Sequence, residues 1–557
     1  MNDRNSSLES VAAAANDLTN APGKTLSVAD RILLCRQCID AVYENAVDWA
    51  KQATIAKGLS PSSPLRAEDL LSGPAVVARQ LQLTVQTLTA IQRHGSPKLT
   101  EQPTRLSNGQ LSVPVFPTNG FFDSLTFMGI RGAVRLHRDV DPAEIHGTLV
   151  RTAAADKVGG ITGVLGAGNV SSIPATDSLN KIMFEGRRVL LKMNPVNQYL
   201  APIFVQAFAP LIKADLLRIL TGGPDVGGAI VHHDSVDEVH ITGSAATHDA
   251  IVWGSDPAER SRRRQNDDPL LQKTVTSELG NVTPWIIVPG EYSTRQLQSQ
   301  AQHVAASITN NASFNCLATK VIVTWKNWRQ RDQFLTLVKH NLAVTPTRPA
   351  YYPGAAERFE RFAGVDLSAD HNGCLPWTLL VDQSIEHRPE LFQEESFVCV
   401  CAETRLDTNT PEQFLAAATA FVNDRMTGTL CASVTMPPRF RRQHGDAVAR
   451  CLSDLRYGSV CLNQWSGLAY GLVSPPWGAY PGATPANVQS GIGNVHNTYL
   501  LDHVEKTVLD GPLVNFPNPV WFPSHRKSVA VATQLVQLYH RPSVFRLPGL
   551  FAAALMG

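Results

Sequence analysis

The chain has 557 residues, of which 43% are hydrophobic and 17% charged, and its formal net charge is +1. A chain of this length has enough apolar residues to fill about two to four domains. Its nearly balanced charge provides no field that would attract nucleic acid or an acidic membrane surface, so neither partner is predicted.

The beginning of the chain is polar. The first 25 residues are mostly polar or charged, and we expect a mobile segment there. They also lack the apolar core of a secretory signal. No later window approaches the roughly 18 uninterrupted apolar residues of a membrane-spanning helix. The nine cysteines are scattered and odd in number, which favours a reducing compartment over a disulfide framework. These features predict a cytoplasmic protein that is not embedded in a membrane.

Residues 28–95 carry apolar side chains at helical spacing, interrupted by the turn GLSPSSP at 58–64. Cys35 and Cys38 form a C-x-x-C inside this helical pattern, with no second pair nearby. A structural role for the two thiols is therefore favoured over a zinc or redox site, and no metal site is predicted.

From about residue 158, short β-branched runs alternate with helical stretches, as in RRVLLK at 187–192 and VDEVHITGS at 236–244. Strands and helices that alternate in this way build a parallel sheet of the doubly wound, dinucleotide-binding type. A second alternating series runs from about 291 to 480, and a tail rich in Gly, Pro and Asn follows. The sequence thus predicts an α/β fold with two α/β domains.

The stretch NNASFNCLATK at 310–320 lies between an alanine-rich helical stretch and a strand-like run. Alone, Cys316 would most simply be a small buried hydrophobe. Other candidate catalytic or binding residues, however, stand at or just after the ends of predicted strands. Asn169 lies in a glycine-rich turn, Lys192 and Glu278 end strands, and Gly243 precedes a helix.

Seven motifs follow one another in a fixed order: GAGN (166–169), LLK (190–192), ITGS (241–244), SELGN (277–281), FNC (314–316), EESF (394–397) and PPWGAYPG (475–482). This ordered set resembles the aldehyde dehydrogenase superfamily, in a divergent branch, from about residue 120 to about residue 510. The resemblance implies a doubly wound dinucleotide-binding domain, a second α/β catalytic domain and an oligomerisation arm.

With the resemblance, the domains are expected as follows: a helical region at 1–130 that packs on the cofactor domain, a cofactor domain at 131–290 with a bridging hairpin near 131–157, a catalytic domain at 291–480, and an oligomerisation segment with a C-terminal extension at 481–557.

The resemblance also implies the catalytic roles. Cys316 would be the nucleophile that forms a thiohemiacetal and then a thioester. The amide of Asn169 and the backbone N–H of Cys316 would stabilise the oxyanion, and Glu278 would activate the hydrolytic water. From the residues alone, Asn169 could equally be a turn residue and Glu278 a solvated carboxylate at a strand end.

For the cofactor, the resemblance assigns Lys192 to the adenosine ribose, and the helix after Gly243 and Ser244 to the pyrophosphate. Glu395 would bind the nicotinamide ribose and Phe397 would pack beside the ring. Each has an ordinary structural alternative: a surface lysine, a helix cap, a surface carboxylate and a core aromatic residue.

Three departures from the family pattern affect these assignments. His248 replaces a second glycine after the TGS turn, Asn281 replaces the last glycine of ELGG, and Pro195 stands where members that prefer NAD often carry glutamate. No carboxylate there repels a 2′-phosphate, so the cofactor is predicted as NAD or NADP.

Three functions stay open. The leading one is oxidation of an aldehyde to a carboxylic acid. A coenzyme A-acylating enzyme would use the same cysteine, but Glu278 favours water as the acyl acceptor. A catalytically silent dinucleotide-binding relative is the third.

Substrate and assembly are expected by analogy as well. Bulky residues expected near the cysteine favour a hydrophobic aldehyde: Phe314, Trp465, Tyr470 and Trp477. A homodimer or homotetramer is expected through the segments 131–157 and 496–510. The extension after about residue 515 matches no family motif, and we expect it to pack on a neighbouring domain or subunit.

Overall fold

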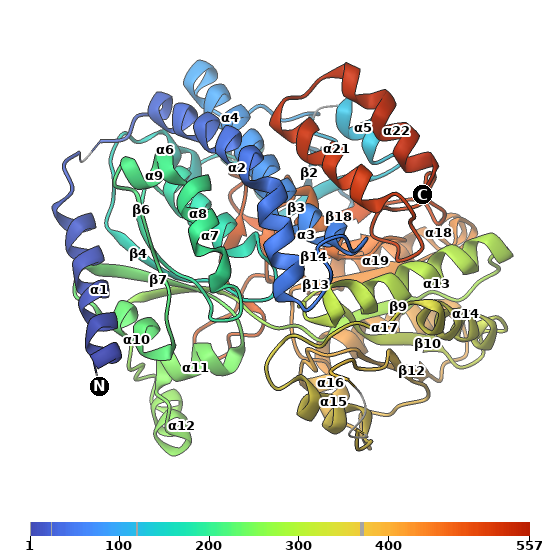
Figure 1. Cartoon of the computed structure of the whole chain (residues 1–557). Helices are drawn as coiled ribbons and strands as arrows, with labels where there is room; N and C mark the ends of the chain where they lie inside the picture. The colour runs from blue at the N-terminus through green and yellow to red at the C-terminus, as the bar shows by residue number, and fades with distance from the viewer. Residues whose placement is uncertain (1, 24, 119–120, 368–371) are drawn as a thin grey trace.

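The computed structural model describes residues 2–23, 25–118, 121–367 and 372–557. Figure 1 shows two β-sheets side by side, each accompanied by helices, with the first and last helices on opposite sides of the molecule. The predicted α/β fold class is confirmed.

The smaller sheet has the strand order β16-β8-β7-β4-β5-β6. Its strands are β4 (Ile161–Leu165), β5 (Arg188–Lys192), β6 (Leu217–Leu220), β7 (Val236–Thr242), β8 (Thr274–Glu278) and β16 (Gly491–Ile492). All pair in parallel except β16, and the direction of winding reverses between β4 and β7. All five residues of β5 are buried, as the continuous apolar run of a strand covered on both faces requires. This is a doubly wound sheet.

The helices that follow these strands along the chain are α7 (Ile173–Met183), α8 (Ala201–Ala207), α9 (Ala209–Lys213), α10 (Pro224–His232), α11 (Ala245–Trp253) and α12 (Pro257–Gln265).

The larger sheet has the order β1-β2-β3-β18-β14-β13-β9-β10-β12-β11. Its strands are β1 (Thr104–Arg105), β2 (Gln110–Phe116), β3 (Arg131–Arg138), β9 (Thr283–Ile287), β10 (Thr319–Trp325), β11 (Thr378–Leu380), β12 (Val400–Leu406), β13 (Cys431–Thr435), β14 (Ser459–Leu462) and β18 (Val504–Asp510). The strands from β18 to β11 are parallel, and β1 to β3 join them as an antiparallel extension.

The helices of this part are α13 (Thr294–Thr309), α14 (Arg331–Val344), α15 (Ala355–Ala363), α16 (Glu390–Gln393), α17 (Pro411–Asp424), α18 (Pro438–Gln443), α19 (Gly445–Asp454) and α20 (Gly467–Leu472). A separate two-stranded sheet pairs β15 (Trp477–Gly478) with β17 (Asn494–His496).

The N-terminal region is helical, but it starts earlier than predicted. The segment expected to be mobile forms α1 (Asn2–Asn20), which contacts α10 and β6. Val11, Ala15 and Leu18 lie on one helical face and are buried in the core beside Ile230. The polar residues between them hide this spacing in the sequence.

Three further helical segments follow: α2 (Val28–Ala56), α3 (Arg66–Leu70) and α4 (Val76–His94), with the π-turn η1 (Leu71–Ala75) joining the last two. A capping box between Ser27 and Asp30 begins α2. Gly95, in the left-handed conformation, ends α4.

The bridging hairpin predicted near 131–157 is a single strand there. Within that span β3 is followed by the 3₁₀ turn η2 (Pro142–Glu144) and by α6 (Thr148–Ala154), and the antiparallel partner of β3 is the earlier strand β2. Asp139, with a positive φ, and Pro142 end the extended run after β3.

The C-terminal extension consists of α21 (Ser528–His540), η5 (Val544–Arg546) and α22 (Leu547–Leu555). Helix α21 packs on α2, α3, η1 and α4, and Figure 1 shows α21 and α22 beside α5 (Phe122–Thr126). Over the ranges that the structure describes, every helix is too short or too polar to span a bilayer.

Candidate active site

Four predicted site residues lie at one edge of the smaller sheet. Lys192 and Glu278 are the last residues of β5 and β8, Gly243 follows β7, and Asn169 lies in the turn after β4. Because these strands are parallel, their carboxyl ends form one crevice next to the point where the winding reverses. That crevice is where doubly wound sheets bind ligands.

The turn before Cys316 has a strained backbone. Residues 311–313 all have positive φ values of 51°, 54° and 68°. Such values are unfavourable for residues other than glycine and persist only where surrounding contacts impose them. Here the Asn311 amide donates to the carbonyls of Asn169 and Phe314, at 2.9 Å each. The turn is thereby fixed to the segment that carries Asn169.

Cys316 and Glu278 are in direct contact across the two sheets. The Sγ of Cys316 lies 3.2 Å from Glu278 Oε1. Burial raises the pKa of Glu278 to about 8, and the charges of Asp177 and Glu395 add to this effect. Burial also raises the pKa of the Cys316 thiol well above its usual value, with further contributions from Glu278 and Glu395. The resting pair is thus a neutral thiol that donates to the Glu278 carboxyl group, which can take the thiol proton only in its ionised form.

Glu395 belongs to the same cluster. Its carboxylate lies against Gly280, where a Cβ would stand only 2.3 Å from Glu395 Oε2. Burial raises the pKa of Glu395 to about 7, while the ammonium group of Lys320 acts in the opposite direction. Its Oε1 atom is buried and has no hydrogen-bond partner among the described residues. A buried carboxylate oxygen without a partner is available to a ligand hydroxyl.

Asn169 is buried, and its side chain donates to the carbonyl of Phe314 at 3.1 Å. The Tyr351 hydroxyl donates to the Asn169 carbonyl at 3.1 Å. A carboxamide carries two N–H donors, so one remains after the contact with Phe314. The Asn169 amide and the Cys316 turn are held together through shared hydrogen bonds.

Lys192 ends β5 and the start of α11 follows β7, and these two strands flank β4. Burial lowers the pKa of Lys192, and Asp225 acts in the opposite direction. A Cβ placed on Gly243 would meet no atom within 4 Å, so the space beside it is open. The side chain of Ser244 caps α11 by accepting from the backbone N–H of Thr247 at 3.1 Å. An exposed helix start beside an open glycine suits a phosphate.

The Aldehyde dehydrogenase family sequence model matches residues 136–347, the span from β3 to α14 that carries Asn169, Glu278 and Cys316. Over this span the chain resembles the aldehyde dehydrogenase family. The identities to the relatives below are low, which is consistent with a divergent branch. The aldehyde dehydrogenase LUC3 of a Fusarium species is 26% identical over 156 residues, which are 28% of this chain and 30% of the relative. The N-succinylglutamate 5-semialdehyde dehydrogenase of Novosphingobium aromaticivorans is 26% identical over 194 residues, which are 34% and 38%. The chain therefore spans less than half the length of these curated relatives.

Solved aldehyde dehydrogenase structures share the fold over most of both chains. The NAD-dependent aldehyde dehydrogenase of Sinorhizobium meliloti superposes with a TM-score of 0.60 at 16% identity, covering 90% of this chain and 86% of that one. The glyceraldehyde-3-phosphate dehydrogenase GapN of Methanocaldococcus jannaschii, complexed with NADP, gives 0.56 at 15%, covering 92% and 94%. At such identities the likeness establishes the fold alone.

Two of the residues that depart from the family pattern lie where they leave the crevice open. His248 is fully buried, and its Nδ1 lies 3.3 Å from the carboxylate of Asp249. It therefore does not occupy the exposed start of α11. Pro195 is exposed in the turn after β5.

The structure brings only two of the four expected aromatic residues to an apolar cavity. Trp465 and Tyr470 line a cavity of ≈ 190 Å³ that also touches Asn315 and Leu317, the neighbours of Cys316. Phe314 instead packs against Tyr351, Tyr352 and Phe397, with ring centroids 5.1, 5.6 and 5.9 Å away. Trp477 is buried and forms a side-chain hydrogen bond with Glu278.

The sequence did not single out Asn311 or Asp177. Asp177 is buried on α7, accepts a hydrogen bond from Thr242 Oγ1 at 2.8 Å, and contributes to the raised pKa of Glu278. The doubled asparagine beside Cys316 was a usable signal for a strained turn. Nothing local marks Asp177, since an isolated aspartate on a helix is usually solvated.

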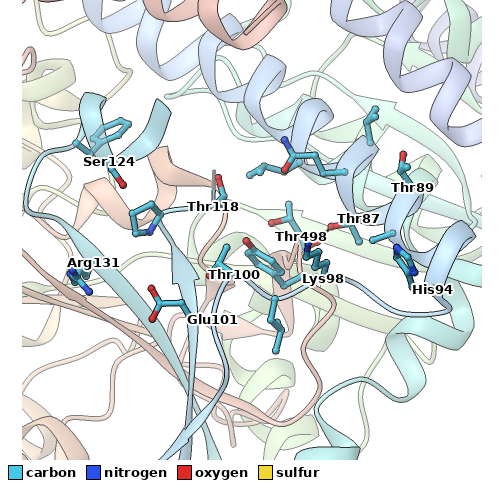
Figure 2. A pocket seen from close by; sticks show the side chains of 18 of the residues that line it. Thr87, Thr89, His94, Lys98, Thr100, Glu101, Thr118, Ser124, Arg131 and Thr498 are labelled. Atoms are coloured by element: carbon cyan, nitrogen blue, oxygen red, sulfur yellow. Dashed lines mark hydrogen bonds between the residues drawn. The ribbon is translucent and has the colours of Figure 1, made fainter. Parts of the chain in front are cut away.

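A larger hollow of ≈ 870 Å³ lies elsewhere, next to α4 and the start of β3. Figure 2 shows its wall of hydroxyl and charged side chains, including Thr87, Lys98, Glu101 and Arg131. None of the predicted catalytic or cofactor residues lines it. The candidate site, defined here by the Cys316–Glu278 contact, is therefore separate from this larger hollow.

Proposed function

We propose that this chain oxidises an aldehyde to a carboxylic acid with NAD or NADP, through a thiohemiacetal and a thioester on Cys316. One observation carries the proposal: the Cys316 thiol donates to Glu278 at 3.2 Å, at the carboxyl edge of a doubly wound sheet. A nucleophile within hydrogen-bond reach of a base is the arrangement that covalent catalysis requires.

In the first step Glu278 accepts the thiol proton while Sγ forms a bond to the aldehyde carbon, and the carbonyl oxygen becomes an oxyanion. The free N–H of the Asn169 amide and the backbone N–H of Cys316 donate to that oxyanion. The strained turn at 311–313 supports this role, because it holds the two donors in fixed relation.

The residues present fit a dinucleotide. Lys192 would hold the adenosine ribose, the start of α11 at Gly243 and Ser244 would hold the pyrophosphate, and Glu395 would accept from the nicotinamide ribose through its unpartnered Oε1. Phe397 would pack beside the ring. When bound, the nicotinamide accepts the hydride that leaves the thiohemiacetal carbon. With Pro195 in place of a carboxylate, both NAD and NADP are admissible.

Release of the acid requires a base that activates water. Glu278 first releases the thiol proton to solvent and then takes a proton from water as the hydroxyl adds to the thioester carbon. Collapse of this intermediate frees the acid and the Cys316 thiolate, which takes the proton back from Glu278. This buried carboxyl group favours hydrolysis over transfer to coenzyme A. It also weighs against a catalytically silent relative, since burying a carboxyl group without a task is costly.

The same reasoning extends to the compartment, the kind of aldehyde and the assembly of the protein. All nine cysteines are free, which supports a reducing, cytoplasmic compartment. The apolar cavity beside Cys316 supports a hydrophobic aldehyde. A homodimer or homotetramer remains the expected assembly by family resemblance.

The test is a trapped intermediate. Glu278→Gln should release NAD(P)H more slowly than the wild type, up to about one per active site, and then stall, because the thiol must ionise without its base and deacylation has none. Mass spectrometry should then find the acyl group on the peptide that contains Cys316. Loss of both this NAD(P)H release and the acyl adduct, in a variant that still binds the dinucleotide, would contradict the mechanism.

A further inference from the structure

The apolar cavity beside Cys316 has a wall that the family motifs do not supply. Several of its lining residues belong to the C-terminal extension: Val520, Trp521, Phe522, Pro523, His525, Ser528, Leu535 and Tyr539. These residues come from the loop before α21 and from one side of α21. The extension therefore closes the cavity within the same chain.

The opposite side of the cavity belongs to the reaction centre. Val170 follows Asn169, and Asn315 and Leu317 flank Cys316. Trp465 stands between them, with its indole N–H bonded to the Leu317 carbonyl at 2.7 Å. A molecule in this cavity would thus have one end against the neighbours of Cys316 and the other against the extension.

The extension is fixed in place at both of its ends. Asn515 Oδ1 lies 3.0 Å from Gln464 Nε2 and 2.9 Å from His303 Nε2. At the end of α21, His540 Nε2 lies 2.7 Å from Asp40, and its ring stacks on Tyr43 at 4.0 Å. Buried leucines fasten the helix between these points. Such a wall is preorganised, and it restricts what the cavity admits.

We propose that the C-terminal extension, through Leu535 and Trp521, sets the length and apolar character of the aldehyde that the enzyme accepts. This inference rests on the proposed function and adds the residues that determine specificity. The lining of this cavity is mainly apolar. The substrate class is therefore an unbranched or aromatic aldehyde with an apolar body.

Two matched variants test the wall. Leu535 and Leu538 are both buried on α21 and belong to the same core cluster, but only Leu535 lines the cavity. Leu535→Ala removes apolar side-chain volume from the wall, and Leu538→Ala removes the same side chain away from it. Both variants should lose comparable stability, so the second controls for folding.

The readout is kcat/KM for straight-chain aldehydes from two to twelve carbons. For the wild type, kcat/KM should rise about fourfold for each methylene that is buried and then level off once the cavity is full. Leu535→Ala should move the plateau to longer chains and lower the values for the chain lengths at which the wild type first levels off, whereas Leu538→Ala should keep the wild-type profile. Identical profiles for the two variants would overturn the proposal.

A binding measurement separates this inference from the proposed function. Calorimetry with octanoate, which resembles a product, should show weaker binding to Leu535→Ala and unchanged binding to Leu538→Ala. If no aldehyde is oxidised but octanoate binding follows this pattern, the proposed reaction is wrong, and the inference that the extension shapes the cavity is supported. If aldehydes are oxidised but Leu535→Ala changes neither the kcat/KM profile nor octanoate binding, the inference about the extension is wrong.

Discussion

The raised pKa of Glu278 predicts a specific pH dependence of turnover. Burial raises this pKa to about 8, and the nearby charges of Asp177 and Glu395 add to the effect. A general base works only when ionised, and the ionised fraction falls tenfold for each pH unit below the pKa. At pH 7 about a tenth of the sites carry ionised Glu278, and at pH 6 about a hundredth. When deacylation limits turnover, kcat should fall by the same factors.

Asp177→Asn perturbs this ionisation in a known direction. Removing a neighbouring negative charge favours the ionised form of Glu278, so its pKa falls and the profile moves to lower pH. Because about nine tenths of the sites are protonated at pH 7, the gain in kcat at that pH is limited to about tenfold.

The assay is stopped-flow NAD(P)H fluorescence from pH 6 to 9.5, with the burst separated from the steady state. The burst amplitude should stay near one per site in Asp177→Asn, which shows that the acylation centre is intact. A kcat that is flat across this range in the wild type would refute the reasoning, and so would a profile for Asp177→Asn displaced to higher pH.

Two further predictions concern the nucleophile and the assembly. Cys316 and Cys374 are the two cysteines that are not fully buried. Cys316→Ala should abolish aldehyde oxidation and retain dinucleotide binding by fluorescence titration, while Cys374→Ala should keep full activity; appreciable turnover by Cys316→Ala would contradict its assignment. Sedimentation should detect a homodimer or a dimer of dimers, and a stable monomer at micromolar concentration would contradict that expectation. Since β18 pairs with β14 and β3 within the chain, contacts between subunits need other surfaces or an exchange of these strands.

The sequence predicted the crevice because the relevant signals are local. Lys192 and Glu278 each end a strand-like run, and Gly243 follows one, so parallel pairing alone brings them to one edge. The position of Cys316 was predicted from a different signal. The order of motifs predicted its neighbourhood, but its contact with Glu278 joins two sheets, and no local pattern specifies such a contact.

Side-chain direction and distant packing were the parts that could not be predicted. Phe314 stands two residues before Cys316, yet the left-handed backbone at 311–313 turns its ring into the core against Tyr351. The packing of the C-terminal extension could not be predicted either, because it depends on residues far away in the sequence. Its apolar residues show that it packs, but only the fold shows that Leu535 lies across a cavity from the neighbours of Cys316.

The change from ELGG to ELGN leaves the proposed catalytic residues in place. The amide of Asn281 donates to Thr283 Oγ1 at 2.8 Å and to the Cys431 carbonyl at 3.0 Å, so it ties β9 to β13. Room for this side chain comes from Gly428, where a Cβ would stand 2.3 Å from Asn281 Oδ1, and whose φ of +104° also favours glycine. The side chain of Asn281 thus packs against the strands of the sheet, and the absence of a side chain at Gly428 makes room for it. Glu278 and Gly280 still face the crevice, so this substitution is a compensated change in how the strands are joined. It gives no support to a silent site.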